Sequence, residues 1–186
     1  MGRVPPPQSS GSAAAGAAPG HEPAGVLDRQ AFDARLADAW AQARGSGQAL
    51  SLLLIDIDHF RAYVDTHRAA LGQERLHRIA GTLTGAVFRP TDLVGRWGDD
   101  EFAILLPGVH EGGARVVAAR VRSLVNALAL PHRGGVGGIV TVSIGLAAYT
   151  PDSDAGPQVL VALCMQALAQ AKRLGRDSIV SQDWLA

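Results

Sequence analysis

Three adjacent carboxylates, Asp99, Asp100 and Glu101, are the residues of this sequence whose types and spacing most directly suggest chemistry. They follow Gly98 and lie between two short apolar runs, a pattern typical of a β-hairpin whose turn carries the acidic residues. Like charges this close repel one another, so the turn loses stability unless a cation or solvent offsets the charge. The residues alone leave two interpretations open, a solvated acidic turn or a cation site.

A second acidic pair comes directly after a predicted buried strand. Residues 49–55 form a continuous apolar run, which favours a central strand buried on both faces, and Asp56 and Asp58 follow it. Burying a carboxylate is costly unless it is paired or binds a metal. We therefore expect Asp56 and Asp100 to lie at strand ends and, with a main-chain carbonyl, water and phosphate, to form a Mg²⁺ site. Asp58 can instead be the N-cap of a helix that begins after it, which is compatible with Asp56 as a metal ligand.

Composition limits the possible partners. The chain has 186 residues, 47% of them apolar, which is enough for one domain with a sizeable core. Lys plus Arg and Asp plus Glu number 17 each, so net charge indicates neither a nucleic-acid partner nor an acidic membrane surface. Cys164 is the one cysteine, which excludes an intrachain disulfide, and we expect it in the core. We expect no membrane span and no signal peptide, and a cytoplasmic location.

The acidic residues must be positioned by an α/β fold. Residues 1–24 are rich in Pro, Gly, Ala and Ser and predict a disordered tail. Helical spacing predicts helices over 27–44, 74–87, 111–128 and 158–174, and apolar runs predict strands over 49–55, 139–147 and 178–180 beside the hairpin. Asp28 is the expected N-cap of the first helix, and Gly145 an expected bulge or close-approach point. We expect one domain over 25–182 with helices flanking a central mixed sheet, and a short tail over 183–186.

Five segments together resemble the GGDEF, or diguanylate cyclase, domain family. They are residues 55–61 (IDIDHFR), 89–92 (RPTD), 96–102 (RWGDDEF), 141–145 (TVSIG) and 171–176 (AKRLGR). The match runs in the family's order from about residue 27 to 180. The resemblance implies a nucleotidyl-cyclase palm fold with a five-stranded sheet, and a reaction that joins two GTP molecules into cyclic di-GMP across a homodimer.

The metal and triphosphate half of the implied site is intact. The resemblance assigns the Mg²⁺ ligands to Asp56, Asp100 and the carbonyl of Ile57, and the proton loss from the attacking 3′-hydroxyl to Glu101. It assigns neutralisation of the triphosphate to Lys172 and Arg176. Arg61 stands where the family usually has Lys, and keeps the charge.

The base-reading half departs from the family pattern. Val64 stands at the guanine-reading Asn and can neither donate nor accept a hydrogen bond, and Gln73 stands at a guanine-binding Asp. Gly98 keeps the first glycine of the signature, but Asp99 replaces the second, which adds a side chain and a negative charge beside the triphosphate. The departures predict a domain that keeps the fold and is impaired in the reaction.

Arg89 and Asp92 form an Arg-x-x-Asp five residues ahead of the signature. In the family this position carries an inhibitory site that binds cyclic di-GMP, and the resemblance places Arg120 to supply a second phosphate contact. The alternative is a surface Arg–Asp pair at the end of the preceding helix.

Three hypotheses follow. The first is a degenerate GGDEF domain that binds cyclic di-GMP through Arg89 and Asp92 and regulates a partner protein. The second is an active diguanylate cyclase that uses GTP and Mg²⁺. The third is a nucleotide-binding or interaction domain without turnover. A homodimer formed on ligand addition is a further expectation.

Overall fold

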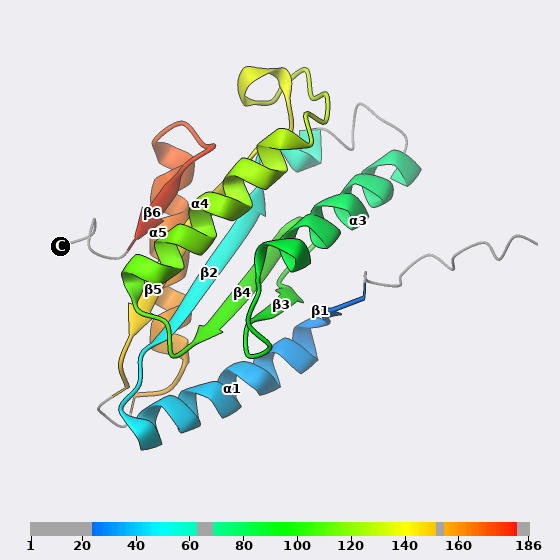
Figure 1. Cartoon of the computed structure of the whole chain (residues 1–186). Coiled ribbons are helices and arrows are strands. Elements are labelled where there is room, and N and C mark those ends of the chain that lie inside the picture. The colour runs from blue at the N-terminus through cyan, green and yellow to red at the C-terminus, as the bar shows by residue number, and fades with distance from the viewer. Residues whose placement is uncertain (1–23, 63–68, 152–154, 182–186) are drawn as a thin grey trace, which may run out of the picture.

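The computed structural model describes residues 24–62, 69–151 and 155–181 (Figure 1). Apart from the β3–β4 hairpin, its helices and strands alternate along the chain, as is typical of an α/β fold. In chain order they are β1 (Val26–Leu27), α1 (Arg29–Ser46), β2 (Leu50–Ile57), α3 (Ala69–Ala86), β3 (Leu93–Arg96), β4 (Glu101–Pro107), α4 (Glu111–Ala127), a 3₁₀ turn (Val136–Gly138), β5 (Val142–Tyr149), α5 (Gln158–Arg173) and β6 (Ile179–Ser181).

One mixed sheet has the strand order β1-β3-β4-β2-β5-β6. The expected sheet of five strands is therefore wrong by one, because residues 26–27 form a short strand parallel to β3 and pair with Val94 and Gly95. We expected Leu27 to begin the first helix. That helix starts two residues later, after its N-cap Asp28, whose carboxylate accepts a hydrogen bond from the amide of Ala31 at 2.7 Å.

β2 lies at the centre of the sheet, and all eight of its residues are buried. It pairs antiparallel with β4 on one side and with β5 on the other. The apolar run predicted such a strand, because a strand covered on both faces has no solvent-facing positions. The register sets Asp56, near the end of β2, opposite Glu101 on β4 and Ser143 on β5. The sheet therefore brings the two acidic segments together at one end of its central strands, an end that we call the acidic edge of the sheet.

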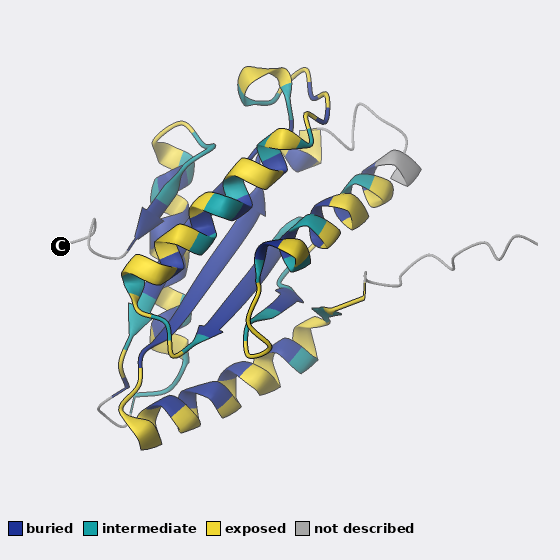
Figure 2. Cartoon of the chain, viewed as in Figure 1, coloured by how far each residue is buried: buried dark blue, intermediate teal, exposed yellow. Residues whose placement is uncertain are grey.

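Helices cover both faces of the sheet. α3 and α4 pack on one face, where Leu53, Ile55 and Ile104 belong to the larger apolar cluster. α1 and α5 pack on the other face, against Leu52 and Leu54. Figure 2 shows the buried strands between helices whose outer faces are exposed. Alternate residues of β2 thus supply two separate cores, which fix the position of its end.

α5 packs directly against the backbone of β5 at Gly145. A Cβ atom built there would lie 2.3 Å from both the carbonyl oxygen of Cys164 and the amide nitrogen of Leu168. β5 keeps a regular register with β2 through this position, so Gly145 is a close-approach point and not a bulge. Cys164 is fully buried, as expected, and burial raises the pKa of its thiol. The glycine therefore brings the helix that carries Lys172 directly onto the sheet.

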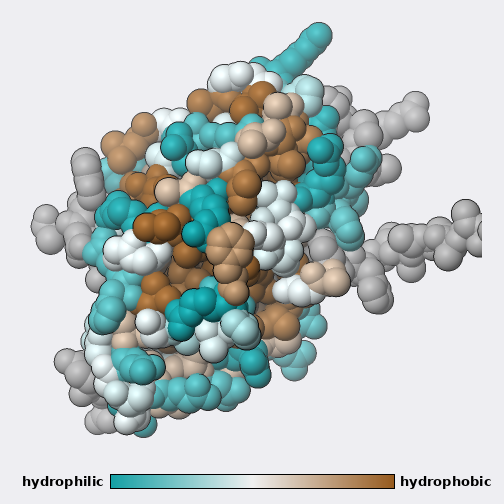
Figure 3. Space-filling view, viewed as in Figure 1, coloured by the Kyte–Doolittle hydropathy of each residue, from teal (hydrophilic) through white to brown (hydrophobic). Residues whose placement is uncertain are grey.

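The surface over α3 and α4 mixes hydrophobic and hydrophilic side chains (Figure 3). Among the exposed apolar residues are Phe88, at 73% exposure, and Val116, at 59%. Within the described ranges, no helix is both long and apolar enough to cross a membrane.

Candidate active site and ligand site

The carboxylates predicted to bind a metal lie together at the edge of the sheet where β2 ends and β4 begins. The amide of Ile57 donates to the carbonyl oxygen of Asp100 at 3.1 Å, which joins the end of β2 to the hairpin turn. Asp56 and Glu101 are direct partners in the β2–β4 register. The three carboxylates come from two segments more than forty residues apart, and antiparallel pairing is what brings them together.

Lys172 reaches this edge from the last turn of α5. Its Nζ donates to Oδ2 of Asp56 at 2.6 Å, and the Asp56 side chain is only 11% exposed. The family resemblance assigns Lys172 to the triphosphate, and nothing in the sequence predicts its direct contact with Asp56. The ammonium is thus paired with the buried carboxylate.

Burial raises the pKa of Asp56 to about 6. The hydrogen bond and the charge of Lys172 oppose this rise, while the negative charges of Asp100 and Glu101 add to it. The site therefore holds more negative charge than one lysine balances, which is the condition under which a bound cation is favourable.

The donor set suits a hard divalent cation with few protein ligands. Over the ranges 24–62, 69–151 and 155–181, no three His, Cys, Asp or Glu side chains form a group that could hold a metal ion. The predicted set is smaller, with Asp56, Asp100 and the carbonyl of Ile57, and Mg²⁺ commonly completes its shell with water and phosphate oxygens. Crowding of carboxylates around buried Asp56 fits such an ion, which would compete with Lys172 for the carboxylate.

The acidic turn between β3 and β4 is fastened by main-chain hydrogen bonds and by one arginine. The amides of Trp97 and Gly98 both donate to the carbonyl oxygen of Glu101, at 2.9 and 3.1 Å. Arg96 donates from Nε to the carbonyl oxygen of Gly98 at 2.6 Å and from its guanidinium to that of Asp99. A Cβ at Gly98 would lie 2.8 Å from Oε2 of Glu101, so the glycine makes room for that carboxylate. Sequence reasoning did not predict this role of Arg96.

The base-reading half of the predicted substrate site is only partly visible. Val64 lies outside the described residues. Gln73 is exposed on α3, and Arg61 is exposed just after β2. Asp99 is exposed at the tip of the hairpin turn. The structure thus brings the predicted metal ligands and Lys172 together. The position of the base-reading residues relative to them stays a prediction.

Asp58 has partners that the capping hypothesis did not include. Its carboxylate is 1% exposed and accepts hydrogen bonds from Oγ1 of Thr141 at 2.7 Å and Oγ of Ser143 at 2.6 Å. The amide of Asp177 donates to the same carboxylate at 3.0 Å. Asp58 therefore joins the end of β2 to β5 and to the turn after α5, which carries the predicted phosphate ligand Arg176.

Arg89 and Asp92 lie in the turn between α3 and β3. The amide of Asp92 donates to the carbonyl oxygen of Arg89 at 3.0 Å, and the amide of Arg89 donates to Oδ2 of Asp92 at 3.3 Å. Their charged groups are 4.0 Å apart. The Asp92 side chain is 5% exposed, and its buried Oδ1 accepts no hydrogen bond from any described residue. The Arg89 side chain is 50% exposed and also donates to the carbonyl oxygen of Pro107 at 3.1 Å.

Arg120 reaches the same turn from α4. It donates to the carbonyl oxygen of Ala86, the last residue of α3, at 2.8 Å. Its guanidinium carbon lies 4.3 Å from the ring centroid of Phe88, which is highly exposed. Arg120 thus lies beside Phe88, the residue before Arg89, and its contact with a ligand phosphate stays a prediction. Phe88 was not predicted as part of the site, although an exposed aromatic next to a charged motif is a usable signal.

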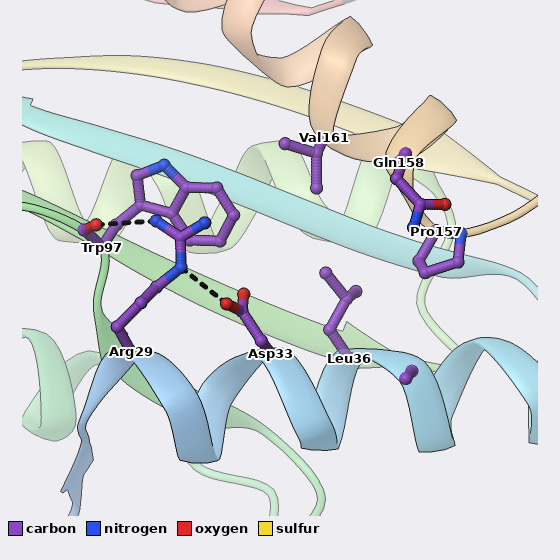
Figure 4. Close-up of a pocket in the computed structure, with 8 residues that line it drawn as sticks. Arg29, Asp33, Leu36, Trp97, Pro157, Gln158 and Val161 are labelled. Carbon is purple, nitrogen blue, oxygen red and sulfur yellow. Dashed lines mark hydrogen bonds and ion pairs between the residues drawn. The ribbon is translucent and has the colours of Figure 1, made fainter.

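A cavity of about 370 Å³ lies between the start of α1, the start of α5 and the signature turn. Arg29 and Asp33 from α1 and Val161 from α5 line it, and Trp97 forms one wall (Figure 4). Arg29 stacks 3.6 Å from the centroid of the indole, donates to the carbonyl oxygen of Trp97 at 2.9 Å and pairs with Asp33 at 2.8 Å. Trp97 also lines a second cavity, beside Glu101 and Lys172. The first helix thus supports the turn that carries the acidic residues.

We expect Arg29→Ala to lower the free energy of unfolding by about 1–2 kcal/mol, because it removes a stacked cation and a hydrogen bond to the turn. Urea unfolding measures the change. Arg35→Ala removes the same charge from an exposed position on the same helix and should change the free energy by less than about 0.5 kcal/mol. Equal effects of the two substitutions would show that Arg29 does not support the turn.

The sequence model of the family 'Diguanylate cyclase, GGDEF domain' matches residues 23–178, and the chain belongs to this family. The Probable diguanylate cyclase DgcC of Escherichia coli (strain K12) is 31% identical over 153 residues, which are 82% of this chain and 40% of DgcC. The chain therefore spans less than half the length of this relative. It carries the GGDEF domain of cyclic di-GMP signalling proteins.

Two solved structures support the fold. The GGDEF domain of DgcB from Caulobacter crescentus, in complex with c-di-GMP, has a TM-score of 0.76 at 28% identity and covers 85% of this chain and 89% of that one. Diguanylate cyclase SiaD of Pseudomonas aeruginosa, in complex with its activator SiaC, has a TM-score of 0.73 at 30% identity and covers 84% and 58%. The predicted family and palm-like α/β fold are confirmed.

Proposed function

We propose that this domain binds cyclic di-GMP through Arg89 and Asp92, with help from Arg120, and that it is impaired in making cyclic di-GMP. The observation that carries the proposal is the buried Oδ1 of Asp92, which accepts no hydrogen bond from a described residue and lies 4.0 Å from Nη1 of Arg89. Buried acceptors without a partner are rare because each costs free energy. The N–H groups along the edge of guanine are hydrogen-bond donors, and a carboxylate is a good acceptor for them.

Charge and exposure at the turn fit this ligand. Arg89 is half exposed, so its side chain can move away from Asp92 and present its planar fork to a phosphate or to the acceptor edge of guanine. Arg120 adds a second cation, and the exposed ring of Phe88 beside it is a surface on which a base can stack. DgcB, a structural relative, is in complex with c-di-GMP.

Impaired catalysis is proposed from the residues that would read guanine. Gln73 cannot replace a carboxylate that accepts two guanine N–H groups, and Val64 offers no polar group at all. Asp56, Asp100, Glu101 and Lys172 remain together at the sheet edge, so we propose that Mg²⁺ and the phosphates of a nucleotide are still bound there. A bound metal would supply charge neutralisation at the phosphates, and Lys172 and Arg176 would orient them.

A domain that binds cyclic di-GMP but makes little of it would pass the signal to another molecule. We propose that it regulates a protein partner in the cytoplasm, and that the ligand promotes a homodimer. SiaD, another structural relative, is in complex with its activator protein SiaC.

Equilibrium dialysis against labelled cyclic di-GMP tests the proposed site. We expect Arg89→Ala to weaken binding roughly 10–100-fold, the effect of losing one or two charge-assisted hydrogen bonds. Arg35→Ala, on the opposite face of the sheet, is the matched control for loss of one positive charge and should leave the affinity unchanged. Unaltered binding by the Arg89 variant would contradict the proposal.

An active diguanylate cyclase is the second candidate, and the closeness of Asp56, Glu101 and Lys172 favours it. Incubation of the chain with GTP and Mg²⁺, followed by analysis for cyclic di-GMP, separates the two. Turnover that is abolished by Glu101→Gln would establish the second candidate.

A further inference from the structure

The turn between α5 and β6 has an unusual backbone. Gly175, Arg176 and Asp177 have φ angles of 108°, 68° and 42°, so two consecutive residues with side chains lie in the left-handed region. Such residues are uncommon, and they persist only where the surrounding structure holds them in place. Arg176 is the predicted phosphate ligand, so the forces that hold this turn determine where its guanidinium is presented.

Asp177 is held by two side chains of α4. Arg122 donates from Nε to Oδ1 at 2.7 Å and from its terminal nitrogen to Oδ2 at 3.0 Å, and Asn126 donates to Oδ1 at 3.1 Å. Arg122 and Asn126 are four residues apart, so they share one face of the helix and reach the same carboxylate. The two-pronged contact between a guanidinium and a carboxylate fixes orientation as well as distance.

The main chain of the same residue is tied to the acidic edge of the sheet. The amide of Asp177 donates to buried Asp58, which lies two residues after Asp56 and is itself held by Thr141 and Ser143. The amide of Arg176 donates to the carbonyl oxygen of Ala171 at 3.2 Å. One residue, Asp177, thus connects α4, the end of β2 and the turn that carries Arg176.

The protonation equilibrium of the pair agrees with a strong contact. Burial alone would raise the pKa of Asp177, but the hydrogen bonds from Arg122 and Asn126 and the charge of Arg122 outweigh it, so the pKa is lowered. The hydrogen bond to Asp177 raises the pKa of Arg122.

We infer that Asp177, held by Arg122 and Asn126, is a positioning residue that fixes the backbone of Arg176 in the turn after α5 for binding a polyphosphate chain. Without the carboxylate, the turn loses its contacts with α4, and only main-chain hydrogen bonds to Asp58 and Ala171 oppose relaxation of the two left-handed residues toward commoner backbone angles. Such relaxation would change where the Arg176 side chain is presented. The inference rests on the part of the proposed function in which Lys172 and Arg176 bind the phosphates, and it is independent of the Arg89 site.

Calorimetric titration of the whole chain with tripolyphosphate in the presence of Mg²⁺ tests the inference. We expect Asp177→Ala and Arg122→Gln each to weaken binding about tenfold, close to the effect of Arg176→Ala, since each displaces one charge-assisted contact. Glu111→Gln is the matched control, because it removes a carboxylate from another ion pair on α4 and should not change binding. The melting temperature of each variant is measured in parallel.

A purely structural role would lower the melting temperature of both variants and leave the affinity of the folded protein for tripolyphosphate unchanged, and that result overturns the inference. Absence of tripolyphosphate binding by the unaltered chain overturns it as well. If Asp177→Ala does not fold, Arg122→Gln gives the same readout from the more exposed side of the pair. Titration of Arg89→Ala and of the same variants with cyclic di-GMP identifies the binding that depends on the Arg89 site, so failure of the proposed function is recognised separately.

Discussion

The combined substitutions Val64→Asn, Gln73→Asp and Asp99→Gly should raise the rate of GTP turnover roughly 100-fold or more. The first two restore hydrogen-bonding groups for guanine, which contribute about 0.5–1.5 kcal/mol for the neutral amide of Asn and about 1.5–3 kcal/mol for the carboxylate of Asp. The third removes an exposed charge from the tip of the signature turn and lets the backbone approach the phosphates. Rates of cyclic di-GMP formation, measured by chromatography, test the effect.

The control for this prediction is the same triple variant with Glu101→Gln added, which should lose the restored activity. The triple variant should bind Mg²⁺ and tripolyphosphate at least as well as the unaltered chain, since Lys172 and Asp56 are unchanged and Asp99→Gly removes a negative charge. A triple variant that binds both but remains without turnover would show that the defect lies elsewhere than in base recognition.

Gly145→Ala should lower the free energy of unfolding by about 3 kcal/mol or more, because the added methyl group overpacks the contact between α5 and β5. The new Cβ would lie 2.3 Å from main-chain atoms of Cys164 and Leu168, and main-chain atoms of a packed helix cannot move aside as a flexible side chain can. α5 would have to shift away from β5, taking Lys172 with it. Urea unfolding gives the change in free energy.

Gly81→Ala is the matched control, since it adds the same methyl group to an exposed position inside α3. A Cβ built at Gly81 meets no described atom within 4 Å outside its own stretch of helix. Alanine there should raise the free energy of unfolding by about 0.5–1 kcal/mol. Similar losses from both substitutions would contradict the close approach of α5 to the sheet.

The sequence predicted the fold best where apolar pattern and capping residues agree. The apolar run of β2 and the N-cap Asp28 of α1 placed both elements to within about two residues. β1 was missed because two residues are too short to show a period, and only pairing with β3 makes them a strand. The start of α3 at Ala69 was placed five residues too late, since the apolar spacing becomes regular only from Leu76.

The candidate site was predictable where its residues form local motifs. Within each of the two acidic segments, and within the Arg-x-x-Asp, the residues are close together in sequence. Their types and spacing can therefore be recognised without the fold. Contacts between distant residues were not predictable. Asp58 meets Thr141 and Asp177 from 83 and 119 residues away, and Lys172 meets Asp56 from 116 residues away. No local pattern encodes such pairs, because strand register and helix docking create them.

Calorimetric titration of the unaltered chain with cyclic di-GMP is the most direct test of the account. A dissociation constant of about micromolar or tighter is the predicted result, because two arginines and an unsatisfied buried carboxylate oxygen flank one exposed turn. No heat beyond that of dilution, with the ligand at about 100 µM, would contradict the proposal that Arg89 and Asp92 form a receptor site.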